Sequence, residues 1–181
     1  MEKKRNFVWI DLEMTGLNPA KDVILEIATI ITDGQLNVIA EGPELVIYNN
    51  EETLNKMSDV VKAIHTKSGL VNAVRNSSIT LAEAERQTFE FIKKHCKPFE
   101  GLLAGNSVWN DRNFIAQYMP KIRDYLNYRL IDVTSVKELV NQWYPTSPDK
   151  DFKKPENHRA LEDIKYSIAE MAHYRKQFFI S

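Results

Sequence analysis

The first pattern in the chain is an alternation of side-chain character over Phe7–Met14. Neighbouring side chains of a β-strand point to opposite faces, so one face of this segment is aliphatic and the other carries Trp9, Asp11 and Glu13. The next apolar segment, residues 23–32, is rich in β-branched residues and predicts a buried strand. The sequence therefore predicts a sheet whose first strand has one apolar face and one acidic face.

Further along the chain, strand signals give way to helical spacing. The pair Asp33-Gly34 is typical of a hairpin turn and predicts that the chain returns as a strand. Later segments place apolar residues three and four apart, which is typical of amphipathic helices, and Ser135 with Glu138 resembles a capping box. The expected strands are 36–40, 45–48, 102–106 and 129–133, and the expected helices are 55–64 (weakly indicated), 81–95, a segment through 114–119 that stops at Pro120, 135–143, and a last helix that holds Leu161 to Phe178.

The order of these elements predicts the fold class. Three antiparallel strands followed by alternating helices and strands indicate an α/β domain with a mixed central sheet flanked by helices. No internal repeat or low-complexity linker divides the chain, so we expect a single domain over residues 1–181. Residues 144–157 are polar and contain three prolines, which predicts a surface loop long enough to have a functional role.

The charge balance limits the kind of partner. The chain has 24 basic and 25 acidic residues among 181, a net charge of -1, and 43% hydrophobic residues. This is ordinary globular composition and argues against a disordered chain or a coiled coil. Proteins that bind long nucleic acids need many phosphate contacts and usually carry a basic excess. The near-neutral charge therefore disfavours a long nucleic acid, but not a short one that presents few phosphates.

Three further features favour the cytoplasm. The sequence has no apolar run near the roughly 18 residues that a membrane-spanning helix needs. A carboxylate follows the basic N-terminal segment before the apolar core of a signal peptide could form. The single cysteine, Cys96, cannot form an internal disulfide, which fits a reducing compartment. We therefore expect a cytoplasmic protein with no membrane partner.

The candidate chemistry begins with Asp11 and Glu13. Residues two apart on a strand share a face, so these two carboxylates converge. An isolated Asp-x-Glu pair is more often a solvated strand face. Here the strand is hydrophobic and comes first, which favours a central place where paired carboxylates would repel one another without a cation. Mg²⁺ and Mn²⁺ prefer such oxygen ligands.

Two later segments hold further candidates. Asp111 falls at the expected start of a helix, where an acid is also the ordinary complement of the helix dipole. His158 lies where the polar loop meets the last helix, and Asp163 follows about one turn later. A single histidine near a helix start is often incidental, yet imidazole is the side chain best suited to take a proton near neutral pH.

Taken together, these positions resemble the DEDDh family of 3′-to-5′ exonucleases, and most closely the branch that degrades very short RNAs. The family pattern is Asp-x-Glu on the first strand, an acid that opens a mid-chain helix, and His-x4-Asp near the C-terminus. Its five places are filled in order by Asp11, Glu13, Asp111, His158 and Asp163. Flanking runs extend the resemblance over nearly the whole chain, among them WIDLEMTGLNPAKDVILEIATIITD, HTKSGL, LLAGNSVWNDRNFI, YRLIDVTSVKEL and ENHRALEDI.

The resemblance implies the fold, the cofactors and the reaction. The fold would be the RNase H-like, DnaQ-like exonuclease fold. Two divalent ions, Mg²⁺ or Mn²⁺, would be bound by Asp11, Glu13 and Asp163, with Asp111 completing the site directly or through water. His158 would be the general base for the attacking water. The products would be nucleoside 5′-monophosphates released from the 3′ end of RNAs of about two to five nucleotides, which present few phosphates.

The resemblance also implies substrate contacts and a homodimer. Leu17 would be a wedge between two bases, and His65 and Ser107 would hold the terminal 5′ phosphate. Tyr128 and Arg129 would close this pocket from the neighbouring subunit. Other interpretations remain open, because a shared fold does not prove a contact. Leu17 could be turn packing, His65 and Ser107 surface polar residues, and Tyr128-Arg129 the start of a strand.

One departure and two rival functions remain. The family often has a tryptophan shortly before the HTKSGL run, where this chain has Val60, and base stacking can contribute about 1–3 kcal/mol. The departure affects the expected substrate affinity more than the chemistry. The rival enzyme is a general DEDDh exonuclease acting on longer RNA or single-stranded DNA. The rival outside enzymes is a binding module on the same fold, which predicts the loss of at least one carboxylate.

Overall fold

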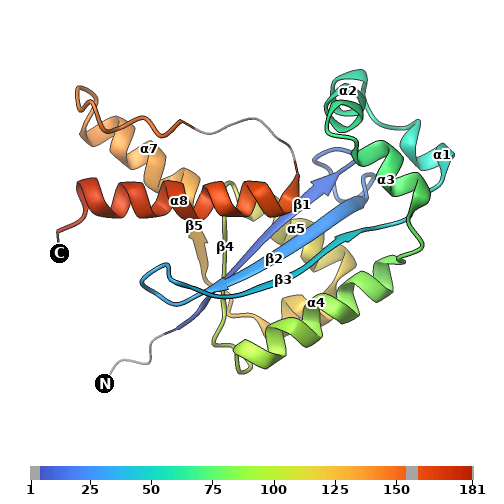
Figure 1. Ribbon diagram of the computed structural model, residues 1–181, viewed down its shortest axis with the longest axis horizontal. Coiled ribbons are helices and arrows are strands. Elements are labelled where there is room, and N and C mark those ends of the chain that lie inside the picture. The colour runs from blue at the N-terminus through green and yellow to red at the C-terminus, as the bar shows by residue number, and fades with distance from the viewer. Residues whose placement is uncertain (1–4, 154–158, 181) are drawn as a thin grey trace.

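The computed structural model describes residues 5–153 and 159–180. A five-stranded sheet in the order β3-β2-β1-β4-β5 forms its centre (Figure 1). Strand β2 pairs antiparallel with both β1 and β3, whereas β4 pairs in parallel with both β1 and β5. The predicted mixed sheet with a central first strand is confirmed. The strands are β1 Phe7–Met14, β2 Ile24–Thr32, β3 Val38–Val46, β4 Leu102–Gly105 and β5 Leu130–Asp132.

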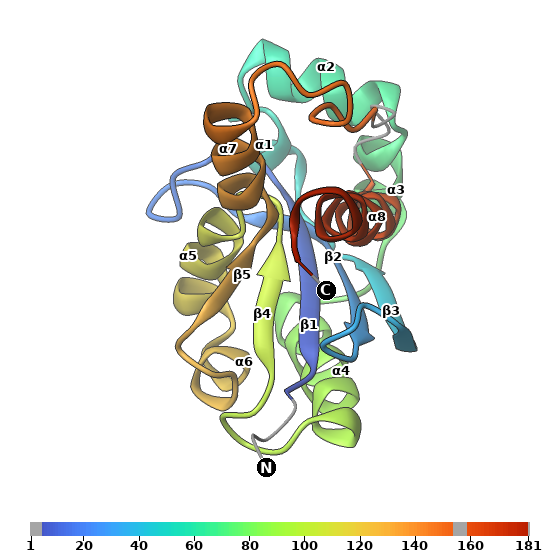
Figure 2. The same ribbon diagram turned by 90° about the vertical axis from the view of Figure 1, so that its left-hand side faces the viewer.

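Helices cover both faces of the sheet. Helix α8 lies across one face and α4 across the other, as Figures 1 and 2 show from two directions. Helices α5 and α6 pack on the α4 side, and α7 packs beside α8. The helices are α1 Glu51–Leu54, α2 Asp59–Lys67, α3 Leu70–Asn76, α4 Leu81–His95, α5 Trp109–Tyr118, α6 Pro120–Tyr125, α7 Val133–Trp143 and α8 Ala160–Phe178. Among the helices of the described residues, none is both long and apolar enough to cross a membrane.

The alternation along β1 divides its side chains between two cores. Val8, Ile10 and Leu12 are buried with residues of α4, α5 and α6. Trp9 points the other way and is buried with residues of α7 and α8. A third apolar cluster packs α1, α2 and α3 against Leu25 of β2. This division confirms the predicted faces and puts the acidic residues of β1 on the face that α8 covers.

The sheet edge corrects one prediction. The expected strands 36–40 and 45–48 are one strand, β3, which continues through Gly42 and Pro43 with register shifts. Proline lacks a backbone N–H and is tolerated at a sheet edge, where β3 lies. A turn-like dipeptide therefore does not end this strand.

Several helix bounds also differ from the prediction. The helix expected over 55–64 begins only at Asp59, because Ser58 caps it by accepting a hydrogen bond from the Val61 N–H. Pro120 ends α5 as expected but is also the first residue of α6, where its missing N–H costs nothing. Helix α7 begins at Val133, before the expected capping box, since Asp132 at the end of β5 supplies the cap. Helices α1, α3 and α6 were not predicted.

Candidate active site

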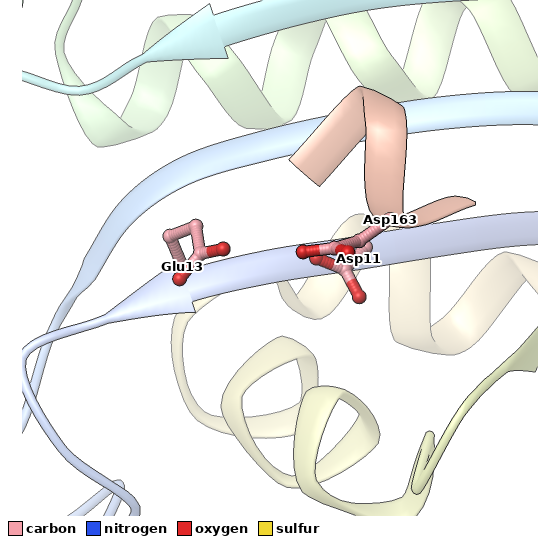
Figure 3. Close-up of side chains that lie close together, drawn as sticks. All are labelled: Asp11, Glu13 and Asp163. Atoms are coloured by element: carbon pink, nitrogen blue, oxygen red, sulfur yellow. The ribbon is translucent and has the colours of Figure 1, made fainter. Parts of the chain in front are cut away.

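Three of the predicted acids meet above β1. Asp11 and Glu13 project from the strand, and Asp163 reaches them from the first turn of α8 (Figure 3). One carboxylate oxygen from each residue lies within 4.8 Å of the other two. Oxygen ligands at this spacing match a hard divalent cation such as Mg²⁺ or Mn²⁺.

The position of Asp163 follows from how α8 packs. The helix buries Ala160, Ile164 and Ile168 against the sheet, so the neighbouring Asp163 lies at the edge of this apolar stripe. The Asp163 N–H donates to the Arg159 carbonyl at 3.0 Å, and its carbonyl accepts from the Ser167 hydroxyl at 2.8 Å. The backbone that carries the third acid is therefore held from both sides.

The electrostatics of Glu13 indicate that the site is built for a cation. Burial, as the largest cause, and the negative charges of Asp163, Glu26 and Asp111 together raise the pKa of Glu13 from 4.5 to about 8, while Arg159 opposes the rise. A carboxylate crowded by like charges favours its neutral form unless a positive charge is present. A divalent ion would supply that charge, so the donor set fits the metal that the sequence predicts.

Asp111 lies beside the same stretch of β1. It is 5% exposed, and its Oδ1 accepts a hydrogen bond from the Leu12 N–H at 2.9 Å. Strand β4 pairs with β1 only from Phe7 to Trp9. Beyond Trp9, the Asp111 carboxylate is a hydrogen-bond acceptor for the backbone of β1. Burial raises the pKa of Asp111, and the hydrogen bond from Leu12 opposes the rise.

His65 and Leu17 lie next to Glu13 at the end of β1. The His65 Nε2 is 2.9 Å from the Met14 carbonyl oxygen, and its Nδ1 is 3.8 Å from Glu13 Oε2. His65 is 3% exposed, which rules out the alternative of a surface polar residue, whereas Leu17 is 70% exposed. Both residues line a cavity of about 170 Å³, together with Glu13, Met14, Gly16, Val61 and Ile64. Val60, where the family often has tryptophan, is exposed and directly precedes Val61, one of the residues that line this cavity.

Ser107 sits in a polar network after β4. Its backbone has a φ of 48°, in the left-handed region, and its N–H donates to Asp132 Oδ1 at 2.9 Å and to Thr134 Oγ1 at 2.8 Å. The side chain of the preceding residue, Asn106, donates to the Ser167 hydroxyl at 2.9 Å. This network joins the Ser107 loop to α8 one turn after Asp163.

The remaining predicted residues lie apart from the three acids or outside the described part of the chain. Tyr128 and Arg129 are exposed between α6 and β5, with the guanidinium 4.5 Å from the Tyr128 ring centroid. Tyr128 lines a different cavity of about 340 Å³, which also includes Phe99 and Arg112. His158 lies outside the described residues.

The sequence reasoning missed a buried ion pair under the start of α8. Glu26 is fully buried in β2, and Arg159 donates to both of its carboxylate oxygens. A glutamate inside the otherwise apolar run VILEIATII was the available signal, because charged residues are almost never fully buried unless paired.

Comparisons with known proteins give consistent results. Residues 8–171 match the family model described as exonuclease. The chain is 49% identical over 175 residues to an oligoribonuclease of Pasteurella multocida, covering 97% of this chain and 95% of that protein. It is 45% identical over 181 residues to an oligoribonuclease of Dichelobacter nodosus, covering 100% and 99% of the two chains.

Solved structures that resemble this fold include exonuclease I enzymes. One, described in terms of how processivity is achieved, has a TM-score of 0.72 at 16% identity and matches 96% of this chain. Another, from Methylocaldum szegediense, has a TM-score of 0.69 at 19% identity. The chain spans about two fifths of the length of each, 41% in both cases. At this identity the likeness establishes the fold, and it confirms the expected DnaQ-like architecture.

Proposed function

The chain belongs to the exonuclease family and, within it, to the oligoribonucleases, and from this premise we propose that it hydrolyses very short oligoribonucleotides, dinucleotides included, from their 3′ ends to nucleoside 5′-monophosphates. This reaction would complete RNA degradation. A single exonuclease domain over residues 1–181, acting in the cytoplasm, is part of the proposal. The net charge of -1 supports a short substrate, because a substrate with few phosphates needs no broad basic surface.

The convergence of Asp11, Glu13 and Asp163 carries the proposal. Three carboxylates within 4.8 Å would repel a phosphodiester, so the reaction needs positive charge between them and the substrate. We assign two divalent ions, Mg²⁺ or Mn²⁺, to these three residues, with Asp111 as a further ligand directly or through water. Bound there, the ions would lower the pKa of a water and stabilise the leaving 3′ oxygen.

The general base would be His158. The chain immediately after it is fixed, because Arg159 and the Ala160 N–H both donate to Glu26. Imidazole is the side chain best suited to take the proton of the attacking water near neutral pH. Replacement of His158 by alanine should then lower kcat by about 10²–10⁴-fold and leave Mn²⁺ affinity unchanged. Loss of Mn²⁺ binding in calorimetry would instead make His158 a ligand.

The substrate would lie over the end of β1. Leu17 is exposed beside the cavity that Glu13 and His65 line, so it could separate two bases while His65 and Ser107 meet the terminal 5′ phosphate. Tyr128 and Arg129 would come from a second copy in a homodimer, which fits their place just before β5, two strands away from β1 in the sheet. Full activity in a 21.0 kDa species by light scattering would contradict this shared pocket.

The decisive experiment compares substrate lengths. End-labelled RNAs of two, seven and thirty nucleotides are compared with DNAs of the same lengths. We expect the shortest RNA to be cleaved fastest. An Asp11→Asn sample purified in parallel controls for contaminating nucleases. Faster cleavage of the thirty-mer would favour the rival, a general DEDDh exonuclease. Equal cleavage of DNA would argue against an RNA role, since the 2′-hydroxyl is the usual discriminator.

A further inference from the structure

We infer that Glu26 and Arg159 are positioning residues of the metal site, which fix the first turn of α8 and thereby hold Asp163 over Asp11 and Glu13. Neither residue belongs to the cluster of metal-binding acids. The inference rests on the proposed metal dependence, and it concerns how this chain assembles the site.

The place of Glu26 in the sheet is the first observation. Every residue of β2 from Ile24 to Thr32 is buried, and the Glu26 side chain is 0% exposed. Glu26 is the cross-strand partner of Glu13, so the two carboxylates share the face beneath α8. A charge at such a position is costly unless it is paired and hydrogen-bonded. An aliphatic residue would pack there without that cost, so the carboxylate has a role other than packing.

The partners of Glu26 define that role. Arg159 Nε lies 3.0 and 3.1 Å from the two carboxylate oxygens, and Nη2 lies 2.6 Å from Oε1. The Ala160 N–H donates to Oε2 at 3.1 Å. Arg159 is the N-cap residue of α8 and makes no side-chain cap bond of its own. A carboxylate from β2 therefore takes the place of a local cap, satisfies a helix N–H and complements the helix dipole.

This anchor acts on Asp163 through the first helical turn. The Asp163 N–H donates to the carbonyl of Arg159, and the side chain of Arg159 donates to Glu26. A shift of Arg159 would rotate that turn and move the Asp163 carboxylate away from Asp11. The guanidinium also occupies both oxygens of Glu26, which keeps this fourth acid from competing for the cation. Ligand-orienting partners of this kind commonly change metal affinity by about 10- to 100-fold.

The test is Glu26→Gln in the full-length chain, with Mn²⁺ binding measured by calorimetry in the absence of RNA. Glutamine keeps the shape and can still accept from Ala160, but it removes the buried negative charge that holds Arg159. Only the more exposed Glu44, 3.4 Å from Arg159 Nη2, then remains as an acidic partner of Arg159 among the described residues. We expect Mn²⁺ affinity to fall about 10- to 100-fold. Dinucleotide hydrolysis should fall with it at low Mn²⁺ and recover when Mn²⁺ is raised to saturation. A role confined to stability would not produce this recovery.

Glu51→Gln is the matched control. Glu51 also accepts two hydrogen bonds from one arginine, Arg75, but on the exposed surface of α1 and α3. Its replacement should leave Mn²⁺ affinity unchanged. Arg159→Lys keeps the charge and loses the two-pronged contact, so its Mn²⁺ affinity should lie between those of the wild type and Glu26→Gln.

Two results would overturn the inference. One is a folded Glu26→Gln chain that melts earlier yet binds Mn²⁺ as tightly as the wild type. If Glu26→Gln does not fold, wild-type Mn²⁺ affinity in Arg159→Lys would overturn it instead. Wild-type protein that binds Mn²⁺ but leaves dinucleotides intact would contradict the proposed function alone, and wild-type protein that binds no Mn²⁺ would overturn both.

Discussion

The two faces of β1 differ in what they contribute to the molecule. On one face, Val8, Ile10 and Leu12 are at most 4% exposed and pack against helices α4, α5 and α6. On the other, two residues of the same strand, Asp11 and Glu13, are only partly buried and face a third acid on α8. The eight residues of β1 thus carry part of the apolar core on one face and part of the acidic cluster on the other.

The difference teaches how the site is kept in place. Each fully buried aliphatic side chain stabilises the folded state by about 1.5–3 kcal/mol. The acidic face has the opposite effect, since the raised pKa of Glu13 means that the folded protein disfavours its charged form. Like charges remain close together because the apolar face fixes the strand that carries them. Substitutions on the acidic face should therefore change activity, and substitutions on the apolar face should change stability.

The largest effect should come from Asp11→Asn on the acidic face. The change removes the charge of a proposed metal ligand and keeps the shape of the side chain. We expect kcat to fall by at least about 10²–10³-fold, the usual loss when one preorganised electrostatic contact is removed from an active site. The melting temperature of the metal-free protein should stay the same or rise, because one of three repelling charges is gone. Dinucleotide hydrolysis and thermal unfolding measure the two effects.

Asp124→Asn is the control for this substitution. Asp124 is exposed on α6 and pairs with the neighbouring Arg123, so its replacement should change neither quantity. Wild-type activity in Asp11→Asn would remove Asp11 from the catalytic site.

A large loss of stability should come from Ile10→Ala. Ile10 directly precedes Asp11 and lies on the apolar face of β1. Ile10 is 1% exposed, and its truncation leaves a cavity in the core. The free energy of unfolding should fall by about 2–5 kcal/mol, as measured by urea denaturation. The kcat per folded molecule, measured well below the melting temperature, should stay near the wild-type value. A loss of kcat as large as that of Asp11→Asn would show that the two faces cannot be separated.

The same contrast explains how much could be predicted from the sequence. The faces of β1 follow from local alternation, so its bounds and the convergence of Asp11 and Glu13 were predicted. The start of α7 was misplaced because the cap comes from Asp132, the last residue of the preceding strand. The Glu26–Arg159 pair was missed because its members are 133 positions apart, and no local pattern joins them. The sequence placed Asp163 in the first turn of the last helix, but its grouping with Asp11 and Glu13 was predicted only from the resemblance to a family motif.

The last comparison concerns the pH dependence of the metal-free protein. The pKa of Glu13 is 4.5 in the unfolded chain and about 8 in the folded one. Between these values the unfolded chain is ionised while the folded protein keeps its proton. The contribution of Glu13 to the free energy of unfolding is therefore complete below pH 4.5 and is lost as the pH rises toward 8.

Thermal unfolding in EDTA across this pH window tests the sign. Relative to Glu13→Gln, which cannot titrate at this position, the wild type should lose melting temperature as the pH rises. Each kcal/mol lost corresponds to about 2–4 °C for a domain of this size. Mn²⁺ should reverse the trend, because it favours the charged form and binds with release of a proton below pH 8. Calorimetry in two buffers of different ionisation enthalpy measures that release, and an equal release in Glu13→Gln would assign the proton to another group.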